Sequence, residues 1–285
     1  MTVTDPPPMV SHPPQRWRPD RSVITAIMVK DITAIRRSKA IVLPMLLVPG
    51  VLLIGLPAGI ALFAQTRASP DLSGLLANLP ASLAHPIAAL PSAERMIVLV
   101  NGYLLAPLFL VVPLMVSAVL AADAFAGEKE RRTLESLLHL PVRDQDLYLA
   151  KLLVAFVPTV LLSWLGFVFF AVISNAIGWP VMHRLFVPTT LWMILILWVT
   201  PAVASLGLGI MVRVSARAST TQEANQLGGA VIMPLILAAV GQATGLLLLN
   251  VTTVLGIGLI IWTIGLWLIR GGMLRFDRDR IASRL

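Results

Sequence analysis

The side chains best suited to interact chemically lie in one short run between two long apolar stretches, at residues 128–135. If this run is helical, Glu128 with Arg132 and Arg131 with Glu135 are ion pairs four residues apart. Such a pair stabilises an exposed helix by a few tenths of a kcal/mol and performs no covalent step. The run therefore indicates docking rather than catalysis.

A leucine stripe follows the charges. Leu134, Leu137 and Leu138 recur at the spacing of one helical face, and an apolar face of this kind needs a partner surface. Pro141 should end the helix, and we expect Asp144 to be the N-cap of the helix that follows.

The rest of the chain offers little to an enzyme. There is no cysteine, and the four histidines and eleven methionines are scattered, so we predict no metal site. The apolar stretches contain no paired aspartates, no Ser–His pair and no HExxH sequence, and we predict no catalytic residue. A phosphate-binding loop of the form GxxxxGK[ST] is missing as well, so this chain should hold no ATP or other cofactor.

Composition decides the class of protein. Of the 285 residues 57% are hydrophobic and 13% are charged, whereas soluble domains average about 45–50% and about 25%. Most of the chain must therefore face the lipid bilayer. In such a protein the net charge of +8 reports orientation and does not point to nucleic acid.

Uncharged runs locate the membrane spans, each of which needs about 20 apolar residues. The last run, 224–269, would reach about 69 Å as one helix, which is enough for two crossings with a turn near 250–253. We predict an all-α domain over 20–285 with six transmembrane helices near 41–64, 96–121, 148–175, 189–212, 228–247 and 252–270.

Basic residues indicate the orientation. Nineteen of the 22 Lys and Arg lie on the side shared by both termini, and only Arg67, Arg95 and Arg184 lie on the other. By the positive-inside rule both termini are cytoplasmic. We expect the protein in a bacterial plasma membrane.

We predict a different structure for each segment that flanks the first span. The proline-rich residues 1–19 should be a disordered cytoplasmic tail rather than a signal peptide. Residues 21–39 are amphipathic and should form a helix in the membrane interface, or else a plain extension of the first span. The external loop 65–95 should hold one or two short helices, acting in packing or as a lid.

The charged run is also specific to a family. The pattern Glu128-x-Glu130-Arg131-x-Thr133-Leu134-Glu135-x-Leu137-Leu138-x-x-Pro141, with Lys151 beyond it, resembles the signature of ABC-2-type transporter permeases. Six spans, an interfacial N-terminal helix, a longer first external loop and cytoplasmic termini match the same family. The resemblance thus covers nearly all of the chain after its tail.

The resemblance implies a role for residues 123–147 as a coupling loop. It assigns Thr133 to Leu138, including Leu134 and Leu137, to a coupling helix that sits in a cleft of an ATP-binding subunit. It places Glu128, Glu130, Arg131 and Glu135 in the polar network beside that helix. Arg132 stands where many members have glycine. The resemblance therefore does not fix where the chain bends before Thr133.

The resemblance also implies partners. ATP and Mg should bind two copies of a separate ATP-binding subunit, and this chain should pair with itself or with a related permease. A second contact with that subunit could come from the 213–227 loop, although we expect a solvated linker there.

A pathway at the dimer interface would be lined by the second and fifth spans, which makes Asn101, Tyr103, Gln226 and Gln242 candidate pathway residues. Hydrogen bonding between helices is the alternative for each. Apart from Lys151 no span holds a charge, which disfavours the rival, an ion-coupled carrier. We expect export of a drug-like or amphipathic compound, with sodium efflux as an alternative.

Overall fold

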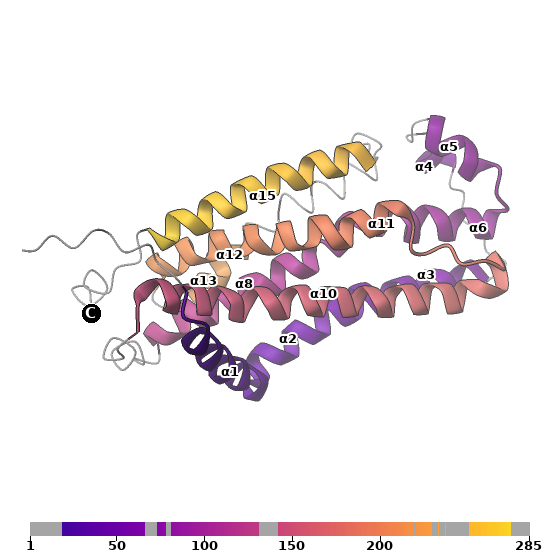
Figure 1. The fold of residues 1–285 in the computed structure, drawn as a ribbon. Helices are drawn as coiled ribbons and strands as arrows, with labels where there is room; N and C mark the ends of the chain where they lie inside the picture. The colour runs from indigo at the N-terminus through magenta and orange to yellow at the C-terminus, as the bar shows by residue number, and fades with distance from the viewer. Residues whose placement is uncertain are drawn as a thin grey trace, which may run out of the picture.

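The structure is a computed structural model that describes residues 19–65, 73–77, 81–130, 142–218, 220–229, 233, 237 and 251–274. Every regular element in these ranges is helical (Figure 1). Within these ranges, five stretches are long and apolar enough to cross a membrane: Lys39–Phe63, Ser92–Gly127, Asp144–Met182, Thr190–Arg217 and Val251–Met273. The predicted span 228–247 lies largely outside the described residues, so the count of six stays a prediction.

Several spans are built from consecutive helical pieces. The first comprises α2 (Lys39–Gly50), the π-helical turn η1 (Val51–Gly55) and α3 (Leu56–Gln65). The second comprises α6 (Ser92–Ile97), η2 (Val98–Leu104), α7 (Leu105–Phe109) and α8 (Val111–Glu130). The fourth comprises α11 (Thr190–Ile194), η3 (Leu195–Val199) and α12 (Thr200–Arg217). The remaining helices are α1 (Arg21–Arg37), α4 (Ser73–Ala77), α5 (Ala81–Ala88), α10 (Asp144–Met182), α13 (Thr221–Gly229) and α15 (Val251–Met273).

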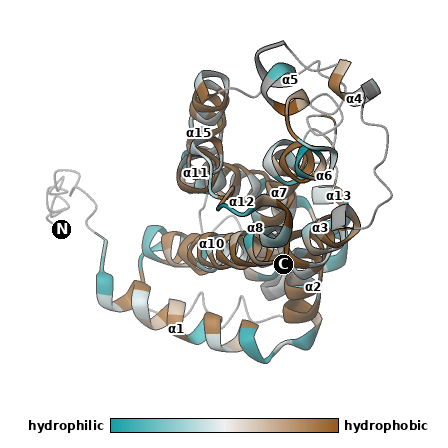
Figure 2. Cartoon of the chain, turned by 90° about the vertical axis from the view of Figure 1, so that its right-hand side faces the viewer, coloured by the Kyte–Doolittle hydropathy of each residue, from teal (hydrophilic) through white to brown (hydrophobic). Residues whose placement is uncertain are grey.

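The N-terminal helix α1 is separate from the first span. Ser38 has extended backbone angles and divides α1 from α2, so the alternative of a plain extension is wrong. Ile24 and Ile35, on the apolar stripe, are buried, and α1 lies against α10. Polar residues alternate with apolar ones along it, whereas the bundle is mostly hydrophobic (Figure 2). Its place at the membrane surface stays a prediction.

An aromatic cluster within the core lies where α7, α10 and α11 meet. Trp192 is fully buried, and its ring lies 4.8 Å from that of Phe170, 5.5 Å from Phe167 and 5.5 Å from Phe109, measured between centroids. Aromatic contacts of this kind stabilise a core by about 0.5–1.5 kcal/mol each beyond the burial of their area. The cluster holds the second, third and fourth spans together.

Helices α12 and α15 pack closely because both carry glycine where they touch. A Cβ added to Gly209 would lie 2.6 Å from Leu268 Cβ, and one added to Gly265 would lie 2.9 Å from the Leu206 amide nitrogen. These contacts advance in step along both helices, so α12 and α15 run in the same direction. The chain between Arg217 and Val251 therefore links opposite ends of the bundle.

The turn η3 receives hydrogen bonds from side chains. Thr200 Oγ1 donates to the Leu195 carbonyl at 3.0 Å, and Trp164 Nε1 donates to the Ile196 carbonyl at 3.1 Å. Trp262 Nε1 donates to the Trp198 carbonyl at 3.2 Å. Because a membrane interior supplies no water to backbone groups, such donors make irregular helix tolerable there. They also join α10 and α15 to the fourth span.

Asp144 does not cap the third span as predicted. The N-cap position belongs to Arg143, whose backbone is extended and whose side chain makes no capping bond, and Asp144 is the first helical residue. Asp146 lies in the same first turn. The positive end of the helix dipole stabilises the negative charge of both carboxylates.

Candidate coupling site

One end of the bundle, on the left in Figure 1, gathers α1, α13, the start of α10 and the last turns of α8, α12 and α15; we call it the basic end. The last described residue of α8 is Glu130. Its Oε2 accepts hydrogen bonds from the Thr221 backbone nitrogen at 3.0 Å and from Thr221 Oγ1 at 2.8 Å. Because Thr221 is the first residue of α13, the Glu130 carboxylate caps that helix and lies at the positive end of its dipole.

Glycines let α13 approach both of its neighbours. A Cβ on Gly127 would lie 2.9 Å from Asp123 Oδ1 and 3.4 Å from Thr221 Oγ1, so a side chain there would crowd the contact between α8 and α13. Farther along α13, Gly228 lies against the Met211 side chain of α12. Helix α13 is thus held by α8 on one side and by α12 on the other.

The expectation of a solvated linker over 213–227 is therefore wrong. Residues 221–229 form a helix that packs against α8 and α12. The sequence did hold one signal, a Thr220-x-x-Glu223 capping box, and the Glu223 backbone nitrogen donates to Thr220 Oγ1 at 3.1 Å. The partnership with Glu130 had no local signal, because the two residues are 91 positions apart.

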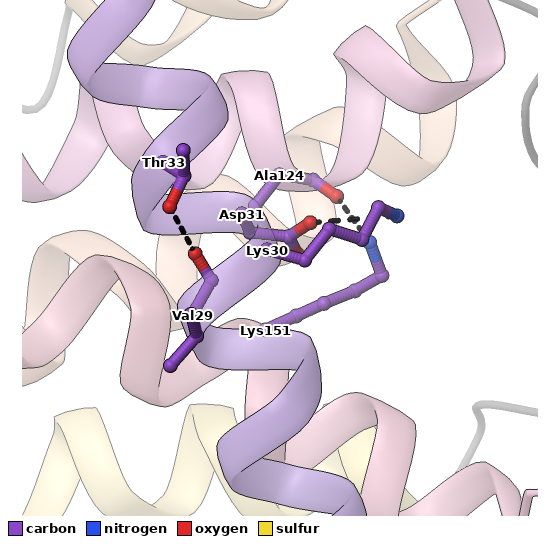
Figure 3. Close-up of polar contacts among 6 residues, drawn as sticks. All are labelled: Val29, Lys30, Asp31, Thr33, Ala124 and Lys151. Atoms are coloured by element: carbon purple, nitrogen blue, oxygen red, sulfur yellow. Dashed lines mark hydrogen bonds and ion pairs between the residues drawn. The ribbon is translucent and has the colours of Figure 1, made fainter.

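A buried lysine ties α10 to α8. Lys151 is 3% exposed, and its Nζ donates a hydrogen bond to the Ala124 carbonyl at 2.9 Å (Figure 3). The ammonium also lies 6.0 Å from the centroid of the Phe125 ring. A buried cation is tolerated only where such acceptors replace water. Figure 3 also shows the ion pair of Lys30 with Asp31 on α1, at 3.6 Å.

The first turns of α10 connect to two further helices. The Asp20 backbone nitrogen donates to Asp146 Oδ1 at 3.3 Å, and Tyr148 donates its hydroxyl to the Ile269 carbonyl of α15 at 3.0 Å. Asp20 caps α1 and accepts from Ser22 Oγ at 2.6 Å. That bond from the Ser22 hydroxyl, and then the backbone N–H groups of Ser22 and Val23, hold the pKa of Asp20 below its usual 3.8.

Both ends of the predicted coupling loop, 123–147, are therefore anchored in the bundle, through Glu130 at one end and Asp146 at the other. A protein-family model described as ABC-2 family transporter protein matches residues 35–221, which is more than half of the chain and includes Glu130, Lys151 and Thr221. The chain belongs to the ABC-2 transporter family. No curated protein sequence matches it.

Membership of the ABC-2 family indicates the general role of this protein. It is a multi-pass membrane protein and the permease component of an ABC transporter, a transport subunit rather than a catalytic one. The family also implies pairing with an ABC ATP-binding subunit.

The predicted coupling residues of the ABC-2 permease are only partly covered by the structure. Glu128 belongs to the last turn of α8, and Glu130 makes the contact described above. The others, Arg131, Thr133, Leu134, Glu135, Leu137 and Leu138, lie outside the described residues. Their assignment stays a prediction.

The predicted pathway residues do not gather at one place. Asn101 lies in η2, fully buried, and its amide nitrogen and oxygen have no hydrogen-bond partner among the described residues. Tyr103 lies in the same turn, partly buried against the core. Gln226 is exposed on α13 at the basic end, away from both, and Gln242 lies outside the described residues. Among the described residues no three His, Asp or Glu side chains gather as a metal site.

Proposed function

We propose that this permease forms, as a dimer, the pathway of an ATP-driven exporter and couples through residues 123–147 to two copies of a separate ATP-binding subunit. The observation that carries the proposal is the pair of hydrogen bonds from Thr221 to Glu130. It joins the helix entering the proposed coupling loop to α13, which leads toward the predicted fifth span. A movement of the loop would thus reach a second part of the bundle directly.

The anchoring of α10 supports the same role. The C-terminal end of the proposed coupling loop, 123–147, runs into the first turn of α10, which is tied to α8 through Lys151 and to α1 through Asp146. When the ATP-binding subunits close on ATP, force applied to the loop would therefore move α8, α10 and α13 together. Because α8 also packs against α12, this movement extends to the fourth span.

Orientation and substrate belong to the proposal as well. The excess of Lys and Arg at the basic end favours placing that end, and both termini, in the cytoplasm of a bacterial cell. The apolar character of the spans favours a drug-like or amphipathic compound over an ion. Asn101, whose buried amide has no partner within the part of the chain that the structure describes, is our first candidate for contact with substrate.

Copurification tests the assembly. The tagged chain is expressed with the ATP-binding subunit encoded beside it, extracted in mild detergent and weighed by native mass spectrometry. We expect two copies of each chain. The control partner is an ATP-binding subunit from an unrelated ABC transporter, which should not copurify. Isolation of the permease without its neighbour's ATPase would contradict the proposed function.

A further inference from the structure

The basic end also carries a surface of arginines and one tryptophan that the coupling site does not use. Arg213 and Arg217 lie one turn apart on α12, and Trp267 and Arg270 lie on the last turns of α15. The Arg213 guanidinium carbon stands 4.8 Å from the centroid of the Trp267 ring. Trp267 is 67% exposed, so this cation–π pair lies on the outside of the bundle.

A glycine positions the guanidinium. Gly271 follows Trp267 by one helical turn and lies on the same face of α15. A Cβ added to Gly271 would lie 2.8 Å from Arg213 Nη2. The arginine of α12 therefore reaches over the Trp267 ring to the position beside Gly271, because no side chain occupies that position.

The positive charge of this surface is not neutralised within the described part of the chain. None of the guanidinium groups of Arg213, Arg217 and Arg270 makes a hydrogen bond or an ion pair there. Stacking on an aromatic face leaves the N–H edge of a guanidinium available to an anion. Guanidinium groups suit phosphate because they present parallel donors to its oxygens.

An apolar stripe leads away from the arginines along α15. Ile260 and Ile264 are exposed and recur at the spacing that places them on the face of Trp267. A ligand that fits the whole surface carries an anionic group at one end and a hydrocarbon chain beyond it. Tryptophan and basic residues are enriched where helices meet lipid headgroups, and basic sites between helices bind anionic lipids.

We infer that the ends of α12 and α15 form a binding site for an anionic phospholipid of the leaflet that meets the basic end. The phosphate lies against Arg213 and Arg270, and an acyl chain follows Ile264 and Ile260 over Trp267. This site is a structural lipid site on the outside of the bundle, separate from the transport pathway proposed above.

The test uses the full chain, purified and delipidated in a neutral detergent and titrated with phosphatidylglycerol by native mass spectrometry. Phosphatidylcholine and inorganic phosphate form the other two arms. We expect phosphatidylglycerol to bind more tightly than phosphatidylcholine and to resist competition by phosphate, which has no chain. Arg213→Gln should weaken phosphatidylglycerol binding roughly tenfold, the effect of losing one charge-assisted hydrogen bond.

Matched variants separate a site from general attraction. Gly271→Ala should weaken binding because its Cβ displaces the guanidinium, whereas Gly256→Ala on the same helix meets open space and should not. Lys30→Gln removes an exposed charge at the same end and should leave binding unchanged. If Arg213→Gln fails to fold, the comparison of lipid binding by Gly271→Ala and by Gly256→Ala is sufficient to test the proposal.

The proposal is overturned if Lys30→Gln weakens binding as much as Arg213→Gln, or if phosphatidylcholine binds equally well. Displacement of the lipid by inorganic phosphate would show a simple anion site and would overturn it too. Loss of the lipid when the ATP-binding subunit joins would assign the surface to that protein instead. A permease that binds the lipid but no ATP-binding subunit would contradict the proposed function alone.

Discussion

Glu130 connects two helices of this permease that are far apart in the chain, α8 and α13. Glu130 is the last described residue of α8, and its carboxylate caps α13. One side chain therefore links the segment of the proposed coupling loop to the helix that precedes the predicted fifth span. Because Glu130 is exposed, we expect this contact to stabilise the fold only weakly.

The strength of that joint can be measured by a double-mutant cycle. We expect Glu130→Ala and Thr221→Val, made singly and together, to show a coupling free energy of about 0.5–1 kcal/mol, because the two hydrogen bonds involve an exposed carboxylate. The measurement is chemical unfolding in detergent, repeated as ATP hydrolysis by the reconstituted complex. Strictly additive effects in both assays would contradict a direct role for the contact.

Asp20 should make the stability of α1 depend on pH. Its pKa is lowered in the folded protein, so its contribution is present above 3.8 and is lost as the pH falls through the lower folded value. Asp20→Asn keeps a capping oxygen but cannot titrate. We expect wild type to unfold at a higher temperature than Asp20→Asn at pH 7, with the difference shrinking on acidification. A difference that stays constant with pH would contradict this assignment.

At the scale of residues the sequence was informative only where spacing is local. The Glu128-to-Pro141 pattern identified the family, and Glu130 was among its predicted coupling residues. The partners of Glu130, Lys151 and Arg213 are Thr221, Ala124 and Trp267, which are distant in the chain and carry no periodic signal. Such pairs depend on how the helices pack against one another, and this packing cannot be predicted from a single sequence.

At the scale of whole helices, the sequence predicts the structure well. Five predicted spans coincide with helices to within a few residues at most ends, because a charge-free run of about 20 residues is a direct consequence of the bilayer. The third span extends to Asp144–Met182, beyond the predicted 148–175, since helix continues into its polar flanks. The π-helical turns had no compositional marker, whereas the break at Ser38 falls beside Lys39, where the predicted amphipathic segment 21–39 ends.

The close contact of α12 with α15 makes a prediction at this scale. Gly265→Ala should destabilise the protein by about 1–3 kcal/mol, because the new methyl group meets Ser205 and the Leu206 nitrogen and the helices must separate. Gly256→Ala, on the same helix with open space around it, is the control and should have little effect. Equal unfolding curves for the two variants in detergent would contradict the packing described.

The turn η3 gives a second prediction. Trp164→Phe keeps an aromatic side chain but removes the donor to the Ile196 carbonyl, so we expect a loss of about 1 kcal/mol in unfolding free energy beyond the loss seen in the control. Trp179→Phe is the matched control, since Trp179 is exposed near the far end of α10. The hydrogen bond would be unimportant if both variants unfolded alike.

The whole molecule has a polarity that can be tested by labelling, because the chain contains no cysteine of its own. Single cysteines at the exposed positions Thr25 and Gln222 lie toward the basic end, and Leu185 follows the far end of α10. We expect a membrane-impermeant maleimide to label Leu185→Cys in intact spheroplasts and the other two only in inverted vesicles. Labelling of all three from one side would contradict the proposed orientation.

The parallel pairing of α12 with α15 also has a consequence for how the protein is made. When the fourth span leaves the ribosome, the face that carries Ser205 and Gly209 has no partner, since α15 lies near the C-terminus. That face must wait in the membrane until the rest of the chain has been synthesised. A truncated product would expose close-fitting small residues to the lipid, where insertion chaperones and membrane proteases could recognise it as unfinished.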